Sequence, residues 1–250
     1  MRGSSDVKEP DGETRGRQSD IFKGGVSRHR YEDDQSVKTI VLSRRRPDLT
    51  RDAFRDYYET QHVPLAIRHV PFTKYVRNHL VAPSNAEFDV VSEFQLADPV
   101  AATALATSQI GETLREDAAK FMAEERFTGA GEESLLVGPP RTFETGRVKK
   151  YALLLKRRAY AGEADFIADA RDWGRRLAAE AKAKRVTIDL IRPYAGGRFP
   201  ADAILWLWHN RTFDAGLLES PPKSLEVSRV LTLDAFETPR DKLDAATLIQ

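Results

Sequence analysis

Short runs of apolar residues, alternating or continuous, predict β-strands in the first half of the chain, and turn-forming residues separate them. The strands are predicted at residues 37–43, 74–81, 88–96 and 132–137. Apolar residues at helical spacing predict helices between them, at residues 50–61, 98–105 and 112–122. The order of strand, helix, strand, strand, helix and strand predicts a ferredoxin-like (βαββαβ) module with an antiparallel sheet and its helices on one face.

The second half of the chain repeats this pattern. Residues 39–46 align with residues 151–158 at an offset of 151 − 39 = 112, and at that offset Phe54 falls on Phe166. Duplication of this length predicts a tandem α+β protein. Two ferredoxin-like modules are then expected to bury their open sheet faces on each other, as a single-chain pseudo-dimer of the dimeric α+β barrel type.

The same patterns set the expected boundaries. The first module spans residues 37–137, a linker with Gly138, Pro139 and Pro140 spans 138–147, and the second module spans 148–238. Residues 1–36 combine glycine, serine and mixed charges with few apolar residues, which is typical of a disordered tail. Residues 239–250 are expected to form a short C-terminal tail.

Composition narrows the functional classes. With 39 Lys and Arg against 38 Asp and Glu, the net charge of +1 gives no electrostatic reason to expect nucleic acid or membrane as a partner. The absence of cysteine excludes disulfides, thiolate nucleophiles and Cys-ligated metals, and the five histidines lack metal-ligand spacing, so no metal is expected. No apolar run approaches a membrane span or a signal-peptide core, so we expect a cytoplasmic protein.

Candidate chemistry is concentrated at the end of the first predicted helix. Tyr58 and His62 are four residues apart and share one helical face. Pro64 disfavours helical geometry at Val63, so His62 is expected in the last turn of the helix. An ordinary histidine pKa near 6.5 suits acid–base catalysis. The alternative is a histidine that only interacts with the helix dipole.

The sequence from Tyr58 through His62 to Pro64, after a short strand, resembles the EthD family, and so does the next strand with Tyr75, Asn78 and His79. The resemblance covers residues 37–137. It implies a ferredoxin-like fold, a cofactor-free enzyme such as a decarboxylase, dehydratase or cyclase, and aromatic polyketide-like substrates. His62 would be the general acid/base, Tyr58 its partner, and Tyr75, Asn78 and His79 candidates for binding substrate. Since Asn78 and His79 point to opposite faces of a strand, at most one of them lines the pocket.

Three further residues are candidates for substrate binding. Arg44, in a basic run at a strand end, could bind an acidic group, although such runs are usually solvated. Trp206 and Trp208 share one face of a strand in the second module, where they form either an aromatic wall for a planar ligand or the filling of the barrel.

The leading hypothesis is a cofactor-independent lyase whose small aromatic or polyketide-like substrate lies between the two half-barrels, with Trp206 or Trp208 as its far wall. One alternative is a haem- or oxygen-dependent oxidoreductase of the same fold, with His209 as a candidate haem ligand. Another is a non-catalytic small-molecule-binding accessory protein. At the 112-residue offset Tyr58 maps to Ala170 and His62 to Gly174. One working site per chain is therefore expected, in a pseudo-dimer that could pair further as a homodimer.

Overall fold

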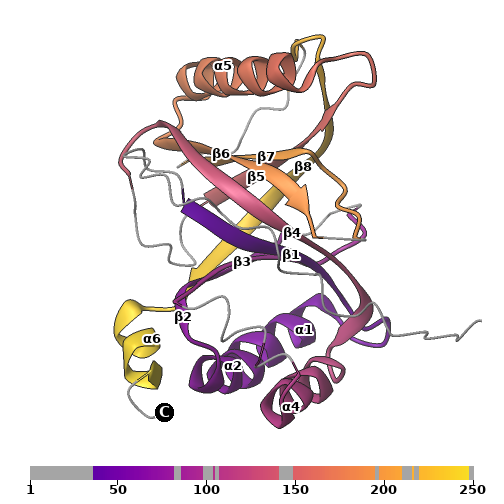
Figure 1. The fold of residues 1–250 in the computed structure, drawn as a ribbon, viewed down its shortest axis with the longest axis vertical. Helices are drawn as coiled ribbons and strands as arrows, with labels where there is room; N and C mark the ends of the chain where they lie inside the picture. Colours follow the sequence, from indigo (N-terminus) through magenta and orange to yellow (C-terminus); the bar gives the residue numbers. More distant parts are fainter. Residues whose placement is uncertain are drawn as a thin grey trace, which may run out of the picture. The chain divides into compact units, whose positions relative to one another are not determined.

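In the computed structural model, eight strands close into one barrel (Figure 1). The structure describes residues 36–81, 86–97, 104, 107–140, 149–194, 197–209, 216 and 220–247. The strands are β1 (Ser36–Arg45), β2 (Phe72–Leu80), β3 (Val90–Leu96), β4 (Met122–Val137), β5 (Lys149–Arg157), β6 (Arg185–Pro193), β7 (Ala203–His209) and β8 (Leu225–Glu237). The helical segments are α1 (Arg51–Tyr57), η1 (Tyr58–His62), α2 (Val63–His69), α4 (Gln109–Ala118), α5 (Glu163–Ala181) and α6 (Arg240–Thr247).

The barrel consists of two halves with the same strand order. The first half runs β4-β1-β3-β2 and the second runs β8-β5-β7-β6, with antiparallel neighbours throughout. This is the ferredoxin-like order, so the predicted fold class is confirmed. The halves also pair edge to edge, β2 with β8 and β4 with β6. Main-chain hydrogen bonds therefore join the modules, in addition to the expected burial of the sheet faces.

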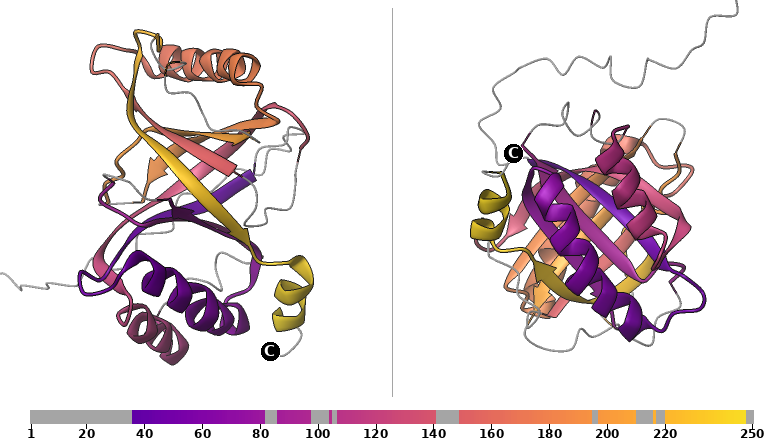
Figure 2. Two further views of the ribbon diagram at one scale, coloured as in Figure 1. Left: turned by 180° about the vertical axis from the view of Figure 1, so that it is seen from behind. Right: turned by 90° about the horizontal axis from the view of Figure 1, so that it is seen from below.

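Helices cover the two outer faces of the barrel (Figures 1 and 2). The helices α1, α2 and α4 lie against the first sheet, and α5 lies against the second. The segment predicted as a C-terminal tail contains α6, whose Leu243 is buried in the apolar cluster of the first module. No helix in the described part of the chain is long and apolar enough to span a membrane.

Several predicted elements differ from the structure or lie outside its described part. β4 begins at Met122, ten residues before the predicted strand, because polar and glycine-rich residues from 122 to 131 pair with β1 on one side and, near their end, with β6 on the other. The predicted tail, residues 1–36, lies outside the described residues except for Ser36. The same holds for the predicted helix at 98–105, apart from Ala104, and for the linker beyond Pro140.

The first helix continues past the point where we expected it to end. A π-helical turn, η1, lies between α1 and α2, and both His62 and Val63 have right-handed helical backbone angles. The Val63 N–H donates to the Tyr58 carbonyl, five residues back. Pro64, which has no N–H to donate, follows immediately and sits in the first turn of α2. The prediction that His62 occupies a helix end is therefore wrong, since the wider turn accommodates the proline inside a continuous helical segment.

The interior of the barrel is apolar except for a network of buried charges. The ammonium of Lys38 on β1 contacts the carboxylates of Glu93, Glu133 and Asp189 on β3, β4 and β6. Its Nζ lies 2.9 Å from Asp189 Oδ2, which belongs to the second module. Two further pairs cross between the modules: Lys150 Nζ lies 2.6 Å from Glu93 Oε1, and Arg185 Nη2 lies 3.1 Å from Glu133 Oε1.

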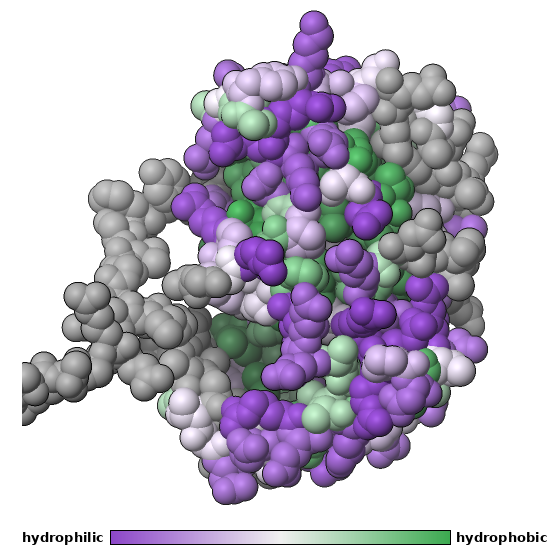
Figure 3. Space-filling view, turned by 90° about the vertical axis from the view of Figure 1, so that its right-hand side faces the viewer, coloured by the Kyte–Doolittle hydropathy of each residue, from purple (hydrophilic) through white to green (hydrophobic). Residues whose placement is uncertain are grey.

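Hydrophobic and hydrophilic residues are also unevenly distributed on the surface. In a space-filling view of one side, hydrophobic residues appear in recesses between hydrophilic ones (Figure 3).

Replacing Lys38 by Met should lower the free energy of unfolding by about 3–5 kcal/mol at pH 8, because it leaves buried carboxylates without their shared cation. The loss should be smaller at pH 5, where the raised pKa of Asp189 lets that carboxyl accept a proton. Urea unfolding at both pH values measures the change in the free energy of unfolding. Lys156→Met removes an equal charge at an exposed position of β5 and should change the free energy by less than about 0.5 kcal/mol. Equal effects of both substitutions would contradict the structural role of Lys38.

A fragment of residues 36–140 should self-associate or precipitate, since it leaves the edges of β2 and β4 unpaired and exposes the apolar inner face of its sheet. Mixing it with a fragment of residues 149–247 should give a soluble complex containing one copy of each. Size-exclusion chromatography with light scattering distinguishes these states. A soluble, monomeric first module would show that the interface between the modules is dispensable.

Candidate functional site

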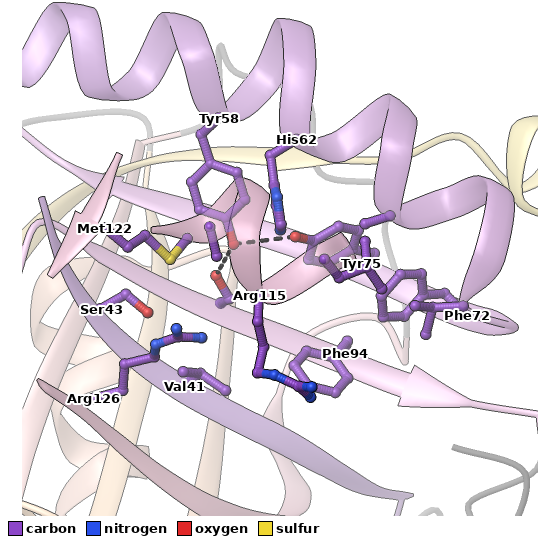
Figure 4. A pocket seen from close by; sticks show the side chains of 15 residues that line it. Val41, Ser43, Tyr58, His62, Phe72, Tyr75, Phe94, Arg115, Met122 and Arg126 are labelled. Carbon is purple, nitrogen blue, oxygen red and sulfur yellow. Dashed lines mark hydrogen bonds between the residues drawn. The ribbon is translucent and has the colours of Figure 1, made fainter. Parts of the chain in front are cut away.

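A cavity of about 230 Å³ lies in the first module, between the outer face of the sheet and the helices that cover it (Figure 4). Its apolar wall comes from both layers and consists of Val41, Ala66, Val70, Phe72, Phe94, Leu114, Ala118 and Met122. Polar side chains complete it, namely Ser43, Tyr58, His62, Tyr75, Ser92, Arg115 and Arg126. Such a mixture of apolar surface with a few polar groups is typical of small-molecule sites.

His62 is paired with a carboxylate from another helix. Its Nδ1 lies 2.9 Å from Oδ2 of Asp117 on α4. An ionised carboxylate only accepts hydrogen bonds, so the proton of a neutral His62 is on Nδ1 and the lone pair is on Nε2. Asp117 also accepts from the Tyr57 hydroxyl at 2.8 Å and from Lys120 Nζ at 3.3 Å. The carboxylate is thus fixed and in turn fixes the tautomer of the imidazole.

The surroundings keep His62 neutral and Asp117 ionised. Burial lowers the pKa of His62 below its ordinary 6.5, and the hydrogen bond and charge of Asp117 offset this only in part. For Asp117, burial by itself raises the pKa, but hydrogen bonds from His62, Tyr57 and Lys120 outweigh it, so the pKa is lowered. At neutral pH the pair is therefore a neutral imidazole with an ionised carboxylate, which is the state that a general base needs.

Three hydroxyl groups form a connected set beside the histidine. Tyr75 donates to the Tyr58 oxygen at 3.1 Å, and the Tyr58 and Ser92 hydroxyls are 2.9 Å apart (Figure 4). Burial raises the pKa of both tyrosines, so both carry their protons at neutral pH. Three protons serve two hydrogen bonds within the set. One proton therefore remains for an oxygen atom of a ligand.

One part of the chain matches a known family. Residues 46–125 match the family model described as the EthD domain. This part of the chain is an EthD domain. An ethyl tert-butyl ether degradation (EthD) family protein from Bacillus halodurans is 24% identical, over 39% of this chain and 98% of its own, with a TM-score of 0.32. No curated protein sequence matches the chain.

Structural similarity extends to both modules. A provisionally named chlorite dismutase shares 9% identity over 86% of this chain and 100% of its own, with a TM-score of 0.51. An anthrone oxidase-like protein shares 8% identity over 83% of this chain and 94% of its own, with a TM-score of 0.52. At these identities the similarity supports the barrel fold alone.

The EthD domain brings together Tyr58, His62 and Tyr75 of the residues singled out from the sequence, whereas Asn78 and His79 do not line the cavity. Asn78 points into the barrel, where its amide donates to Glu93 Oε1 at 2.8 Å. His79 points to the helices, with Nε2 2.7 Å from Glu59 Oε1 and its ring 5.7 Å from that of Tyr58. Asn78 and His79 therefore point to opposite faces of the strand, as expected. The ring of His79 lies beside Tyr58 but does not line the cavity.

The expected position of the substrate between the half-barrels, with Trp206 or Trp208 as its far wall, is wrong for the cavity that contains His62. Both indoles lie inside the barrel, on the other side of the first sheet. The ammonium of Lys150 lies over them, at 4.3 Å and 4.7 Å from the ring centroids, and Trp206 Nε1 donates to Asp189 Oδ2 at 2.5 Å. The alternation of residues along the strand predicted that both indoles share one face of the sheet, but it did not predict which face the helices cover.

Arg44 also lies away from the cavity of the EthD domain. It is exposed and lines a different cavity of about 270 Å³ at the end of β1, together with Glu87 and Phe88. Because successive strand residues alternate, Ser43 faces the helices and Arg44 faces the other way.

The sequence reasoning missed Asp117, Ser92, Ser43, Arg115 and Arg126. One signal was available for Asp117. Leu114, Asp117, Ala118 and Phe121 share one face of the predicted helix at 112–122, so a carboxylate interrupts an otherwise apolar stripe. Nothing comparable marks Ser92 or Arg126, which lie on strands among other polar residues.

In the second module the corresponding space is filled. Ala170 and Gly174 of α5 are buried against the second sheet, at the positions equivalent to Tyr58 and His62. A Cβ atom at Gly174 would lie 2.6 Å from Leu136 Cδ1 and 2.8 Å from Leu205 Cδ1. Only glycine fits at position 174 without rearrangement of its neighbours. This face of the second module therefore has no space equivalent to the EthD-domain cavity at Gly174.

Within the described part of the chain, neither the cavity beside His62 nor the surroundings of His209 fit a haem. The cavity beside His62 is smaller than the 300–1,000 Å³ typical of sites for drug-sized ligands. His209, the candidate ligand from the sequence, has its Nε2 against the backbone carbonyl of Ala181 at the end of α5. Close packing at Gly174 leaves no space between α5 and the second sheet.

The pKa of His62 should be below 6.5, and Asp117→Asn should lower it further, because the carboxylate stabilises the charged imidazolium. NMR titration of the histidine rings, assigned with His62→Gln, measures this without a substrate. Tyr57→Phe removes a neighbouring hydrogen bond to Asp117 but leaves the carboxylate, so its shift should be smaller. A higher pKa in Asp117→Asn would contradict the pairing. Since the folded pKa lies below the unfolded one, this group's contribution to stability should be lost as the pH falls below about 6.5.

Proposed function

We propose that the EthD domain is a cofactor-independent enzyme of the lyase type, such as a decarboxylase, dehydratase or cyclase, that acts on a small aromatic or polyketide-like molecule in the cavity beside His62. The observation that carries the proposal is the pairing of His62 Nδ1 with Asp117 at the edge of an apolar cavity. The confirmed EthD match supports the chemical class, and the shape and polarity of the cavity support a compact, largely apolar substrate.

In the proposed mechanism His62 acts first as a base. Nε2 takes a proton from an activated C–H of the substrate, and the two electrons of that bond pass into an adjacent carbonyl group, which becomes an enolate. The imidazolium that forms is stabilised by the Asp117 carboxylate. The free hydroxyl proton of the set formed by Tyr58, Tyr75 and Ser92 would donate to the enolate oxygen, where negative charge develops.

His62 then acts as an acid. In a dehydration the electrons of the enolate expel a hydroxyl group, which leaves as water after taking the proton from Nε2. In a cyclisation the same carbanion equivalent attacks a second carbonyl carbon, and the new alkoxide takes that proton. In a decarboxylation Nε2 takes the proton of the substrate's carboxyl group instead. The electrons of the C–C bond stay on carbon as CO₂ leaves, and the resulting carbanion takes that proton back from Nε2.

The proton-abstraction step can be tested without the natural substrate. 5-Nitrobenzisoxazole is a small planar probe whose ring opens when a base removes its C–H proton. His62→Gln should lower the protein-catalysed rate by about 10²–10⁴-fold with little change in urea unfolding. His69→Gln, on α2 but outside the cavity lining, should leave the rate nearly unchanged. Equal rates in both variants would contradict a catalytic role for His62.

The alternatives can be tested with the same variants and a second substrate. An anthrone oxidase-like protein shares the fold, so anthrone with an oxygen electrode tests the oxidoreductase alternative. His62-dependent oxygen uptake would favour it over a lyase. If the protein binds aromatic probes in the cavity but His62→Gln changes neither reaction, the non-catalytic binding function is favoured.

A further inference from the structure

We propose that the substrate of the EthD-domain cavity carries a negatively charged oxygen group, a carboxylate or a phenolate, and that Arg126 is the residue that recognises it. This inference rests on the proposed function, because it concerns the same cavity. Arg126 lies on β4, directly opposite Ser43 of β1 in the strand register. In Figure 4 its side chain lies on the sheet side of the cavity beside Ser43 and Val41, while Tyr58 and His62 descend from the helix above.

Arg126 has no carboxylate partner among the described residues, in contrast to Arg45, Arg46, Arg51 and Arg115. Three arginines near the start of the first helical segment are held in ion pairs: Arg45 and Arg51 both contact Asp89, and Arg46 contacts Asp48. Arg115 of α4, which also lines the cavity, contacts Glu112. The carboxylate of the cavity itself, Asp117, is engaged by His62, Tyr57 and Lys120.

An unpaired guanidinium at an apolar cavity favours an anionic ligand over a neutral one of the same shape. The guanidinium is planar and can donate two parallel hydrogen bonds to a carboxylate, with geometry that a lysine does not reproduce. The Ser43 hydroxyl beside it offers a further donor. A ligand bound in this way has its charged end beside β1 and β4 and its uncharged body toward His62 and Tyr58 of the helical segment.

The same interaction links binding to the strength of the base. The positive charge of Arg126 contributes to the low pKa of His62. A ligand anion on Arg126 cancels much of that charge, so the pKa of His62 should rise when an anion binds. His62 then becomes a stronger base only in the complex, which restricts proton abstraction to molecules with the anionic group in place.

The test uses two probes of equal shape, 2-naphthoate and neutral 2-naphthamide, with affinity measured by calorimetry at low salt. The unsubstituted protein should bind naphthoate at least tenfold more tightly than the amide. Arg126→Gln should abolish this preference while leaving the amide affinity unchanged, and Arg126→Lys should restore it only in part. Arg44→Gln is the matched control, because it removes an equal charge beside a different cavity and should preserve the preference.

NMR titration of His62 with and without naphthoate gives a second readout. The pKa should rise on binding in the unsubstituted protein and not in Arg126→Gln. 4-Nitrophenol, measured below and above its own pKa, shows whether a phenolate serves as well as a carboxylate. Equal affinities for naphthoate and naphthamide would overturn the inference while leaving the His62 kinetics, and with them the proposed function, intact. Failure of both naphthalene probes to bind, together with unchanged kinetics in His62→Gln, would overturn both.

Discussion

The buried ammonium group of Lys38 is the centre of the charge network that joins the two modules. Lys38 Nζ lies among three carboxylates from three strands, whose oxygen atoms are within 4.8 Å of one another, a spacing that would suit a metal ion. The lysine supplies the cation instead. Burial raises the pKa of Asp189 to about 6. Burial also raises the pKa of Glu133, but the charges of Lys38 and Lys74 and the hydrogen bond from Lys38 together outweigh it and lower that pKa to about 2. Buried ion pairs add little net stability, but a missing partner is costly, so the network selects one pairing of the two modules.

The charge network and the indoles occupy the barrel interior, whereas the cavity beside His62 lies on the outer face of the first sheet. Trp206 and Trp208 are packed around Lys150 and cannot also line an open pocket. The cavity beside His62 lies between sheet and helices, and the two modules differ there. In the first, the π-helical turn carries His62 over the sheet. In the second, Gly174 lets α5 pack so closely that a Cβ would overlap Leu136.

The sequence predicted what depends on local pattern or on the repeat. Periodicities of a few residues predicted the strand order and the face shared by Tyr58 and His62. The repeat at an offset of 112 residues predicted the two-module barrel. The partners of those residues do not. Asp117 is 55 positions from His62 in the chain, and Arg126 reaches the cavity only because β4 extends ten residues farther than its apolar pattern indicates. Pro64 led to a wrong helix end because the local sequence does not reveal the π-helical turn. Proline has no N–H to donate and would end an ordinary α-helix, but the wider turn accommodates it.

The two modules differ inside the barrel as well as at the positions equivalent to Tyr58 and His62. Lys38 and Lys150 are equivalent, and both are buried and basic. Their neighbours are not equivalent: Glu93 pairs with Ile40 on β1, and Trp206 occupies the matching position opposite Ala152 on β5. A symmetric pair of first modules would place two Glu93 and two Glu133 carboxylates around two lysines. Replacing one glutamate by an indole that lies against Lys150 and donates to Asp189 removes that excess. The second module therefore complements the first module in the barrel interior instead of repeating it.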